Sequence, residues 1–184
     1  MGLPLTDEEL QFIESLERKL IATPVRDHLV KLRNGAIQVC CFDGAHFHEW
    51  YGFVAGIATR QHGGIPNVCP LSLPGGPLVV DPTSPINRVA DHTPAVNFAF
   101  DTAMEIGYRY AVFHGHAGCR AAHKHKISLF TNVDLIVRAK QYFKAKYKGT
   151  EGLCLLHLKH PERGDLHFHL SAKSWLENRD QLRF

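Results

Sequence analysis

Two short segments carry the residues best suited to hold a metal ion. "HGHAGC" places His116 and Cys119 three positions apart, and the two small residues between them allow a tight turn. Far upstream, "CCFD" places Cys41 two positions before Asp43. Zinc favours thiolate and imidazole ligands, and a catalytic zinc site keeps one position open for water. Cys41, His116 and Cys119 are therefore candidates to bind one zinc ion, with Asp43 as a fourth ligand or as the partner of metal-bound water. Cys40 and His114 are alternatives for the first cysteine and for the histidine.

The elements around these segments must bring them together. "AIQVCCF" and "YRYAVFHGH" are apolar runs typical of strands, and the two candidate segments lie at their ends. Helical spacing of apolar residues predicts helices over residues 7–21, 93–107 and 131–149, and Thr6 with Glu9 forms a capping box before the first. Strands that alternate with helices predict an α/β fold with a mainly parallel central sheet flanked by helices. In such sheets ligands gather beyond the carboxyl ends of the strands.

Other parts of the chain have weaker patterns. "LCLLHL" and "LHFHLSAK" are predicted to be two closing strands joined by a turn. Glycine and proline interrupt residues 50–87, where only "PLVVDP", residues 77–82, resembles a short strand. A stretch this long without regular structure is uncommon unless it lines a site or an interface.

Length and composition exclude several classes of protein. The chain has 184 residues, which suits a single domain over 1–184, with a helical arm at 1–34 and an α/β core at 35–184. A net charge of +3 argues against a nucleic-acid binder, and no apolar run is long enough to span a membrane. The acidic, amphipathic start is unlike a signal peptide, so we expect a cytoplasmic protein. Its five cysteines are odd in number and irregularly spaced, which favours metal ligands or buried residues over disulfides.

The combined pattern resembles the metal signature of the β-class carbonic anhydrases. In that family a C-x-D-S-R segment ends the first strand and a G-H-x-x-C-G segment ends a later one, as "CCFDGA" and "HGHAGC" do here. "LPGGPLVV" and "VNFAFDTAMEIGYRYAVFHGHAGC" resemble the intervening turn, helix and strand in the same order. The resemblance covers about residues 35 to 125 well and the flanking elements loosely.

The resemblance implies a fold, a site and a reaction. Cys41, His116 and Cys119 would hold zinc with Asp43 beside it, while Cys40 and His114 would support the site from outside. Zinc-bound hydroxide would attack carbon dioxide to give bicarbonate. The family also implies a homodimer or a higher homo-oligomer, with the amino-terminal helix packed on a neighbour. Because imidazole titrates near neutrality, either of two histidines close to Asp43, at positions 46 and 48, is a candidate to carry the proton away.

One departure from the family pattern bears on catalysis. The family has an arginine two residues after the aspartate, and this arginine turns the carboxylate away from zinc; here that position is Ala45. We predict that Arg120, which stands where the family has glycine, pairs with Asp43 instead. Other candidate cations for this role are His46, Arg60 and Arg88.

Two other functions fit the same residues. The scaffold could hydrolyse another small electrophile, such as carbonyl sulfide or carbon disulfide, and the altered dyad would then reflect the changed substrate. Alternatively, Asp43 closes the metal site and the protein is a non-catalytic zinc protein. Two features are expected to be structural: Cys69 and Cys154 as small buried residues, and His167 and His169 as an exposed pair on one strand face.

Overall fold

The computed structural model describes residues 3–30, 32, 35–42, 47–64 and 67–182 and shows an α/β protein. Within these residues a six-stranded mixed sheet has the order β1-β6-β5-β4-β2-β3. Its strands are β1 (Ala22–Pro24), β2 (Ala36–Cys41), β3 (Val68–Leu73), β4 (Tyr110–His116), β5 (Glu151–His160) and β6 (Gly164–Leu170). Strands β3, β2, β4 and β5 pair in parallel, whereas β6 runs antiparallel to both β5 and β1. The predicted fold class is confirmed, with an antiparallel extension on one side.

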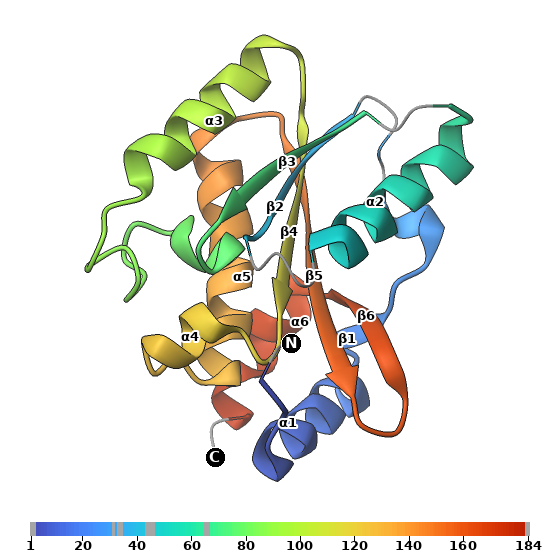
Figure 1. Cartoon of the computed structure of the whole chain (residues 1–184), viewed down its shortest axis with the longest axis vertical. Coiled ribbons are helices and arrows are strands. Elements are labelled where there is room, and N and C mark those ends of the chain that lie inside the picture. The colour runs from blue at the N-terminus through green and yellow to red at the C-terminus, as the bar shows by residue number, and fades with distance from the viewer. Residues whose placement is uncertain (1–2, 31, 33–34, 43–46, 65–66, 183–184) are drawn as a thin grey trace.

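Helices cover both faces of this sheet (Figure 1). The α-helices are α1 (Asp7–Arg18), α2 (Phe47–His62), α3 (Thr93–Glu105), α4 (Arg120–Lys124), α5 (Leu129–Lys146) and α6 (Ala172–Asn178). Three short 3-10 helices are η1 (Asp27–Leu29), η2 (Gly76–Val79) and η3 (Arg179–Gln181). Helix α2 lies on one face, while α3 and α5 lie on the other (Figure 1).

Each face has its own apolar core. Under α2, Val54 and Ile57 pack with strand residues such as Val112, and all three are fully buried. On the opposite face the rings of Phe113 and Phe143 lie 5.8 Å apart within the larger core under α3 and α5. The central strands β2 and β4 are buried along their whole length, as expected of parallel strands covered on both faces. The last residues of the two strands, Cys41 and His116, are buried as well.

The first helix begins as predicted but ends at Arg18, three residues earlier than predicted, and it packs on its own chain. Thr6 and Glu9 form the capping box, with the Glu9 amide donating to Thr6 Oγ1 at 3.2 Å and the Thr6 amide donating to Glu9 Oε2 at 3.0 Å. The ring of Phe12 lies 6.0 Å from that of Phe130 and 6.4 Å from that of Trp175. The apolar stripe of α1 is therefore buried within this chain.

The region 50–87 is more regular than its sequence predicts. It holds most of α2 and all of β3, and the predicted strand over residues 77–82 is wrong. That segment begins with η2, in which the Leu78 amide donates to Gly75 O and the Val80 amide donates to Pro77 O. The apolar run is buried because it packs against the core rather than because it joins the sheet. A short apolar run does not distinguish these two environments.

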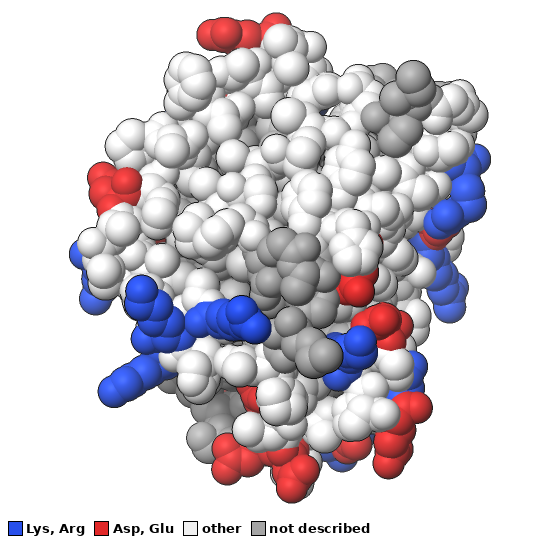
Figure 2. All heavy atoms as spheres, in the orientation of Figure 1, with Lys and Arg blue, Asp and Glu red and all other residues white. Residues whose placement is uncertain are grey.

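The surface has a face that is poor in charge. Figure 2 shows that uncharged side chains cover most of the upper part of one side of the molecule. Among the described residues, five large apolar side chains are more than half exposed: Leu20 (69%), Phe42 (60%), Val89 (73%), Phe98 (74%) and Ile106 (64%). Within the described segments, no helix is both long enough and apolar enough to cross a membrane.

Candidate metal centre

The two predicted segments meet at the carboxyl edge of the sheet. Cys41 is the last residue of β2 and His116 is the last residue of β4. The two strands are parallel neighbours, and their register pairs Cys40 with His114. Adjacent parallel strands end at the same edge, so this register brings Cys41 close to His116. Cys119 follows after a tight turn and caps α4.

Three ligand atoms converge there. The sulfurs of Cys41 and Cys119 and a ring nitrogen of His116 all lie within 4.8 Å of one another. The residues are 4%, 4% and 3% exposed, so the group is almost completely shielded from solvent. The predicted convergence of these residues is confirmed. Of the three remaining predicted site residues, Asp43 and His46 lie outside the described residues, and Arg120 lies within them.

Two glycines allow the chain to pass closely around this group. Gly76 has φ +57°, and a Cβ there would lie 2.5 Å from the backbone of both Cys40 and Cys41. Gly118 has φ +69°, and a Cβ there would lie 2.3 Å from Leu3 O. The Leu3 amide donates to Gly118 O at 3.1 Å, so the first described residues lie against the turn that carries the ligands. Residues other than glycine rarely adopt such positive φ values, and neither position has room for a side chain.

The chemistry of this donor set fits a soft divalent cation. A hydrogen bond with the Cys41 side chain, followed by burial, raises the pKa of the Cys119 thiol, while the amides of Ala121 and Ala122 bond to it and oppose the rise. Two crowded, buried sulfurs are poorly suited to carry negative charge together unless a cation lies between them. Two thiolates and one imidazole are a common zinc set, which leaves one tetrahedral position for another ligand. The group can therefore hold a metal ion, and its donors are those that zinc prefers.

The cation predicted to accompany the site has a defined position. Arg120 is the first residue of α4, directly after Cys119, and it is exposed. Its predicted partner, Asp43, lies outside the described residues, so the pairing stays a prediction. Arg60, an alternative, forms a two-pronged ion pair with Asp27 at 2.7 and 3.1 Å near the far end of α2.

Cys40 and His114 are buried beside the metal group and do not belong to it. Burial raises the pKa of Cys40 to about 12, although a hydrogen bond with the Ser72 side chain acts to lower it. The ring of His114 lies with its Nδ1 atom 3.2 Å from Gln38 Nε2. Burial, followed by the neighbouring His167, lowers the pKa of His114 well below its usual value. Both residues are thus held neutral under the strand ends.

Three imidazoles form a row across the sheet. The register pairs His116 on β4 with His157 on β5, and His157 with His167 on β6. The ring of Trp50, from the first turn of α2, lies 4.5 Å from the ring of His116. Its indole Nε1 donates to His157 Nδ1 at 2.9 Å. His116, a potential metal ligand, is therefore one end of a buried aromatic and histidine cluster.

Two predictions about individual residues are wrong. His167 is not an exposed residue of a strand face, because its ring stacks on Phe53 with centroids 3.8 Å apart. Burial, followed by His157, lowers the pKa of His167 to about 4. Cys69 is exposed rather than buried, because β3 is the outermost strand of the sheet and Cys69 faces away from the core. Cys154 is buried as predicted.

A second set of potential ligand atoms lies around His157, the middle imidazole of this row. Glu49, His157 and Asp165 each place one such atom within 4.8 Å of the others. His157 is 3% exposed, but the side chains of Glu49 and Asp165 are 32% and 50% exposed. We call this set the carboxylate–histidine group, and the first set the cysteine–histidine site.

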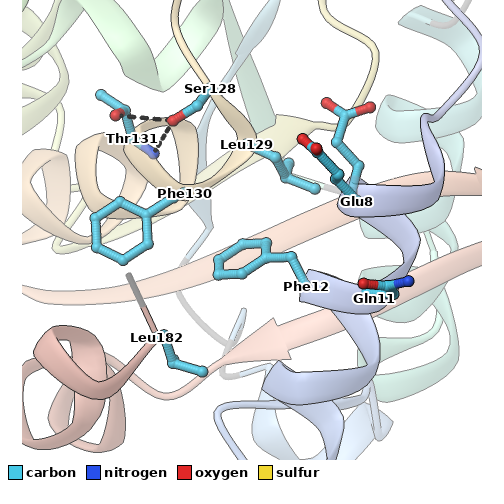
Figure 3. Close-up of a pocket in the computed structure, with 9 residues that line it drawn as sticks. Glu8, Gln11, Phe12, Ser128, Leu129, Phe130, Thr131 and Leu182 are labelled. Atoms are coloured by element: carbon cyan, nitrogen blue, oxygen red, sulfur yellow. Dashed lines mark hydrogen bonds between the residues drawn. The ribbon is translucent and has the colours of Figure 1, made fainter. Parts of the chain in front are cut away.

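Two cavities lie on the α1 side of the molecule. A groove of about 790 Å³ runs between α1 and the amino end of α5, with Phe12, Leu129 and Phe130 along it (Figure 3). None of the three converging ligands lines this groove. A smaller cavity of about 310 Å³ is lined in part by Leu3, Gly118 and Cys119. Only the smaller cavity thus touches a ligand residue.

The cluster around Trp50 was not predicted from the sequence, because helix α2 was not predicted. Trp50, Val54, Ile57 and Ala58 are all buried and recur at i, i+4, i+7 and i+8, a spacing that indicates a helix. No comparable signal links His116 to His157, or His157 to Asp165, because their proximity depends on the order of the strands.

No family model, curated protein or solved structure matches this chain. Its function is therefore inferred from the residues of the site.

Proposed function

We propose that the protein is a zinc-dependent lyase similar to the β-class carbonic anhydrases, which hydrates carbon dioxide reversibly to bicarbonate. The observation that carries this proposal is the convergence of Cys41, His116 and Cys119 at the ends of two parallel strands. Two sulfurs and one imidazole are three protein ligands, the number that catalytic zinc sites use. The ligand spacing in the sequence, the α/β sheet and the position of the site at its carboxyl edge all support the same family.

The residues around the site would bind and orient the reactants. Zinc held there would supply a Lewis acid and a nucleophile generated from water at neutral pH. Two thiolates cancel the formal charge of the ion, so the site depends on nearby positive charge and hydrogen bonds. Arg120, directly after a ligand, is our candidate for that charge through an ion pair with Asp43.

An apolar side chain beside a ligand suits a small uncharged substrate. Phe42 follows Cys41 directly and is 60% exposed. The stacked rings of Phe47 and Tyr51 on α2 extend away from this end of the sheet, because the Tyr51 hydroxyl donates to Val68 O, at the opposite end of β3 from Leu73, the register partner of Cys41. An apolar wall formed by Phe42 would exclude water without offering charge to a substrate that has none.

The decisive experiment is a carbon dioxide hydration assay on zinc-loaded protein. We expect measurable turnover in the wild type and none in Cys119→Ser, which removes a ligand. Arg120→Ala should abolish turnover while leaving zinc content intact. Zinc-loaded wild type without turnover would contradict the proposal, and unchanged turnover in Arg120→Ala would reject the role of that residue alone.

Ala45, in place of the arginine of the resembling family, favours one further candidate: the hydrolysis of carbonyl sulfide or carbon disulfide on the same scaffold. Sulfide release by the zinc-loaded wild type and by Cys119→Ser is measured with each of these substrates. Comparison with their carbon dioxide hydration separates the two activities. A non-catalytic zinc protein with Asp43 as fourth ligand would hold zinc and show neither activity.

We also propose that the chain forms homodimers or higher homo-oligomers. The edge of β3 ends the sheet, and exposed sheet edges pair readily with other chains. Phe98 and Val89 add exposed apolar surface. Light scattering on the purified protein should give at least twice the monomer mass, and a monomer mass at all concentrations would contradict this.

A further inference from the structure

The carboxylate–histidine group looks like a second metal site, but the hydrogen bond from Trp50 argues otherwise. An indole N–H only donates, so His157 Nδ1 must accept at the observed 2.9 Å. The proton of the neutral imidazole then lies on Nε2, which is 3.6 Å from Asp165 Oδ1. A metal ion needs a ring nitrogen without a proton. The tautomer set by Trp50 therefore places a proton, rather than a lone pair, on the His157 nitrogen that faces Asp165.

The same indole is held firmly against the metal ligand. Trp50 is completely buried, and its ring lies over that of His116 with an interplanar angle of 35°. Its carbonyl accepts a hydrogen bond from Gln38 Nε2 at 2.9 Å. The ring face, the N–H group and the backbone of Trp50 are thus each in contact with a different strand of the sheet.

We propose that Trp50 is a positioning residue for the metal ligand His116, and that the carboxylate–histidine group anchors Trp50 rather than binding a second metal ion. His157 accepts the indole hydrogen bond, with the Asp165 carboxylate 3.6 Å from its other ring nitrogen, and the indole face sets the plane of the His116 ring. Groups that orient a metal-ligating imidazole affect metal affinity and geometry strongly. This inference rests on the metal site of the proposed function and does not require that the site be catalytic.

The chain contains a matched control for this idea. Trp175 is also completely buried and also donates its indole N–H, to Asp134 Oδ1 at 2.9 Å. It lies on α6 and packs against Phe12 and Phe130, within the α1 side of the core. Trp50→Phe and Trp175→Phe therefore remove the same groups from two buried places, only one of which touches the metal ligand.

The test measures metal binding by the full chain rather than activity. Cobalt(II) replaces zinc as the probe, and its visible bands report the geometry of the ligands. We expect Trp50→Phe to weaken cobalt and zinc binding by about 10-fold or more and to shift the cobalt bands. Trp175→Phe should lower stability and leave both readouts at the wild-type values. Equal affinity and equal spectra in wild type and Trp50→Phe would overturn the proposal.

A second pair of variants keeps the test valid if Trp50→Phe does not fold. The side-chain oxygen introduced by His157→Gln can accept the indole hydrogen bond, whereas His157→Leu leaves the N–H of Trp50 without it. We expect the glutamine variant to keep the wild-type cobalt spectrum and the leucine variant to lose it. Identical spectra in the two variants would contradict the role of the hydrogen bond.

Metal stoichiometry separates this proposal from a second metal centre. The wild type should bind one equivalent of zinc, and Asp165→Asn should bind one as well. Two equivalents in the wild type and one in Asp165→Asn would show that the carboxylate–histidine group is itself a site, which overturns the inference. Because these readouts need no substrate, they stand even if the carbon dioxide assay fails.

Discussion

The cysteine–histidine site and the carboxylate–histidine group differ although each brings three potential ligand atoms within 4.8 Å. In the cysteine–histidine site all three residues are at most 4% exposed, and two of them are cysteines, which offer sulfur ligands. In the second, only His157 is buried, and its Nδ1 already accepts the Trp50 hydrogen bond. Proximity alone therefore does not make a metal site. Burial, donor type and the protonation state of each ligand decide which group holds an ion.

The largest expected effect is the loss of zinc from the first group. Cys41→Ser or Cys119→Ser replaces a soft thiolate with a hydroxyl, so zinc affinity should fall by more than the roughly 10- to 100-fold that supporting groups contribute. Elemental analysis after dialysis measures the bound zinc. Cys69→Ser, which changes an exposed cysteine, should retain one equivalent. Equal zinc contents in all three variants would contradict the assignment of zinc to the cysteine–histidine site.

A large effect on stability is expected where the backbone closes around the first group. Gly76→Ala combines a positive φ with a clash against Cys40 and Cys41, whereas Gly63→Ala has a similar φ of +61° and open space around it. Gly63→Ala should cost about 1 to 2 kcal/mol of unfolding free energy. Gly76→Ala should cost about 1 to 3 kcal/mol more. Urea unfolding measures both, and equal losses would show that the close approach does not matter.

The histidine row should make stability depend on pH. The pKa of His167 is lowered to about 4 from an ordinary value of 6.5, so between these values the unfolded chain binds a proton that the folded chain does not. Stability is then complete above pH 6.5 and falls by about 2 to 3 kcal/mol as the pH drops through 4. His167→Phe, which keeps a ring against Phe53, should flatten this dependence. The urea midpoints of the wild type and of His167→Phe are measured at pH 7 and pH 5. An equal fall of the midpoint between these pH values in both proteins would contradict the prediction.

The smallest effects are expected at the carboxylates of the second group. Glu49→Gln and Asp165→Asn change partly exposed side chains, so unfolding free energies should stay within about 1 kcal/mol of the wild type. Both variants should keep one equivalent of zinc. A carboxylate variant that loses zinc as completely as Cys119→Ser would mean that the two groups act as one site.

Much of the cysteine–histidine site was predictable because its residues lie close to strand ends. The runs before Cys41 and His116 are apolar and short, and the turn after His116 is made of small residues. The error over residues 77–82 and the missed helix α2 have a common cause. Short apolar runs and glycine-interrupted segments leave the local pattern ambiguous, and tertiary packing decides their structure.

Sequence alone determined the chemistry of the metal ligands and the α/β class, because both depend on residue type and on spacing within single segments. Only the tertiary structure decided that His157 lies beside His116, that Asp165 lies beside His157, and that Trp50 contacts both histidines. Those contacts depend on the order and register of β4, β5 and β6 and on where α2 packs across them. Strand order is a long-range property of the folded chain, and local residue patterns do not encode it.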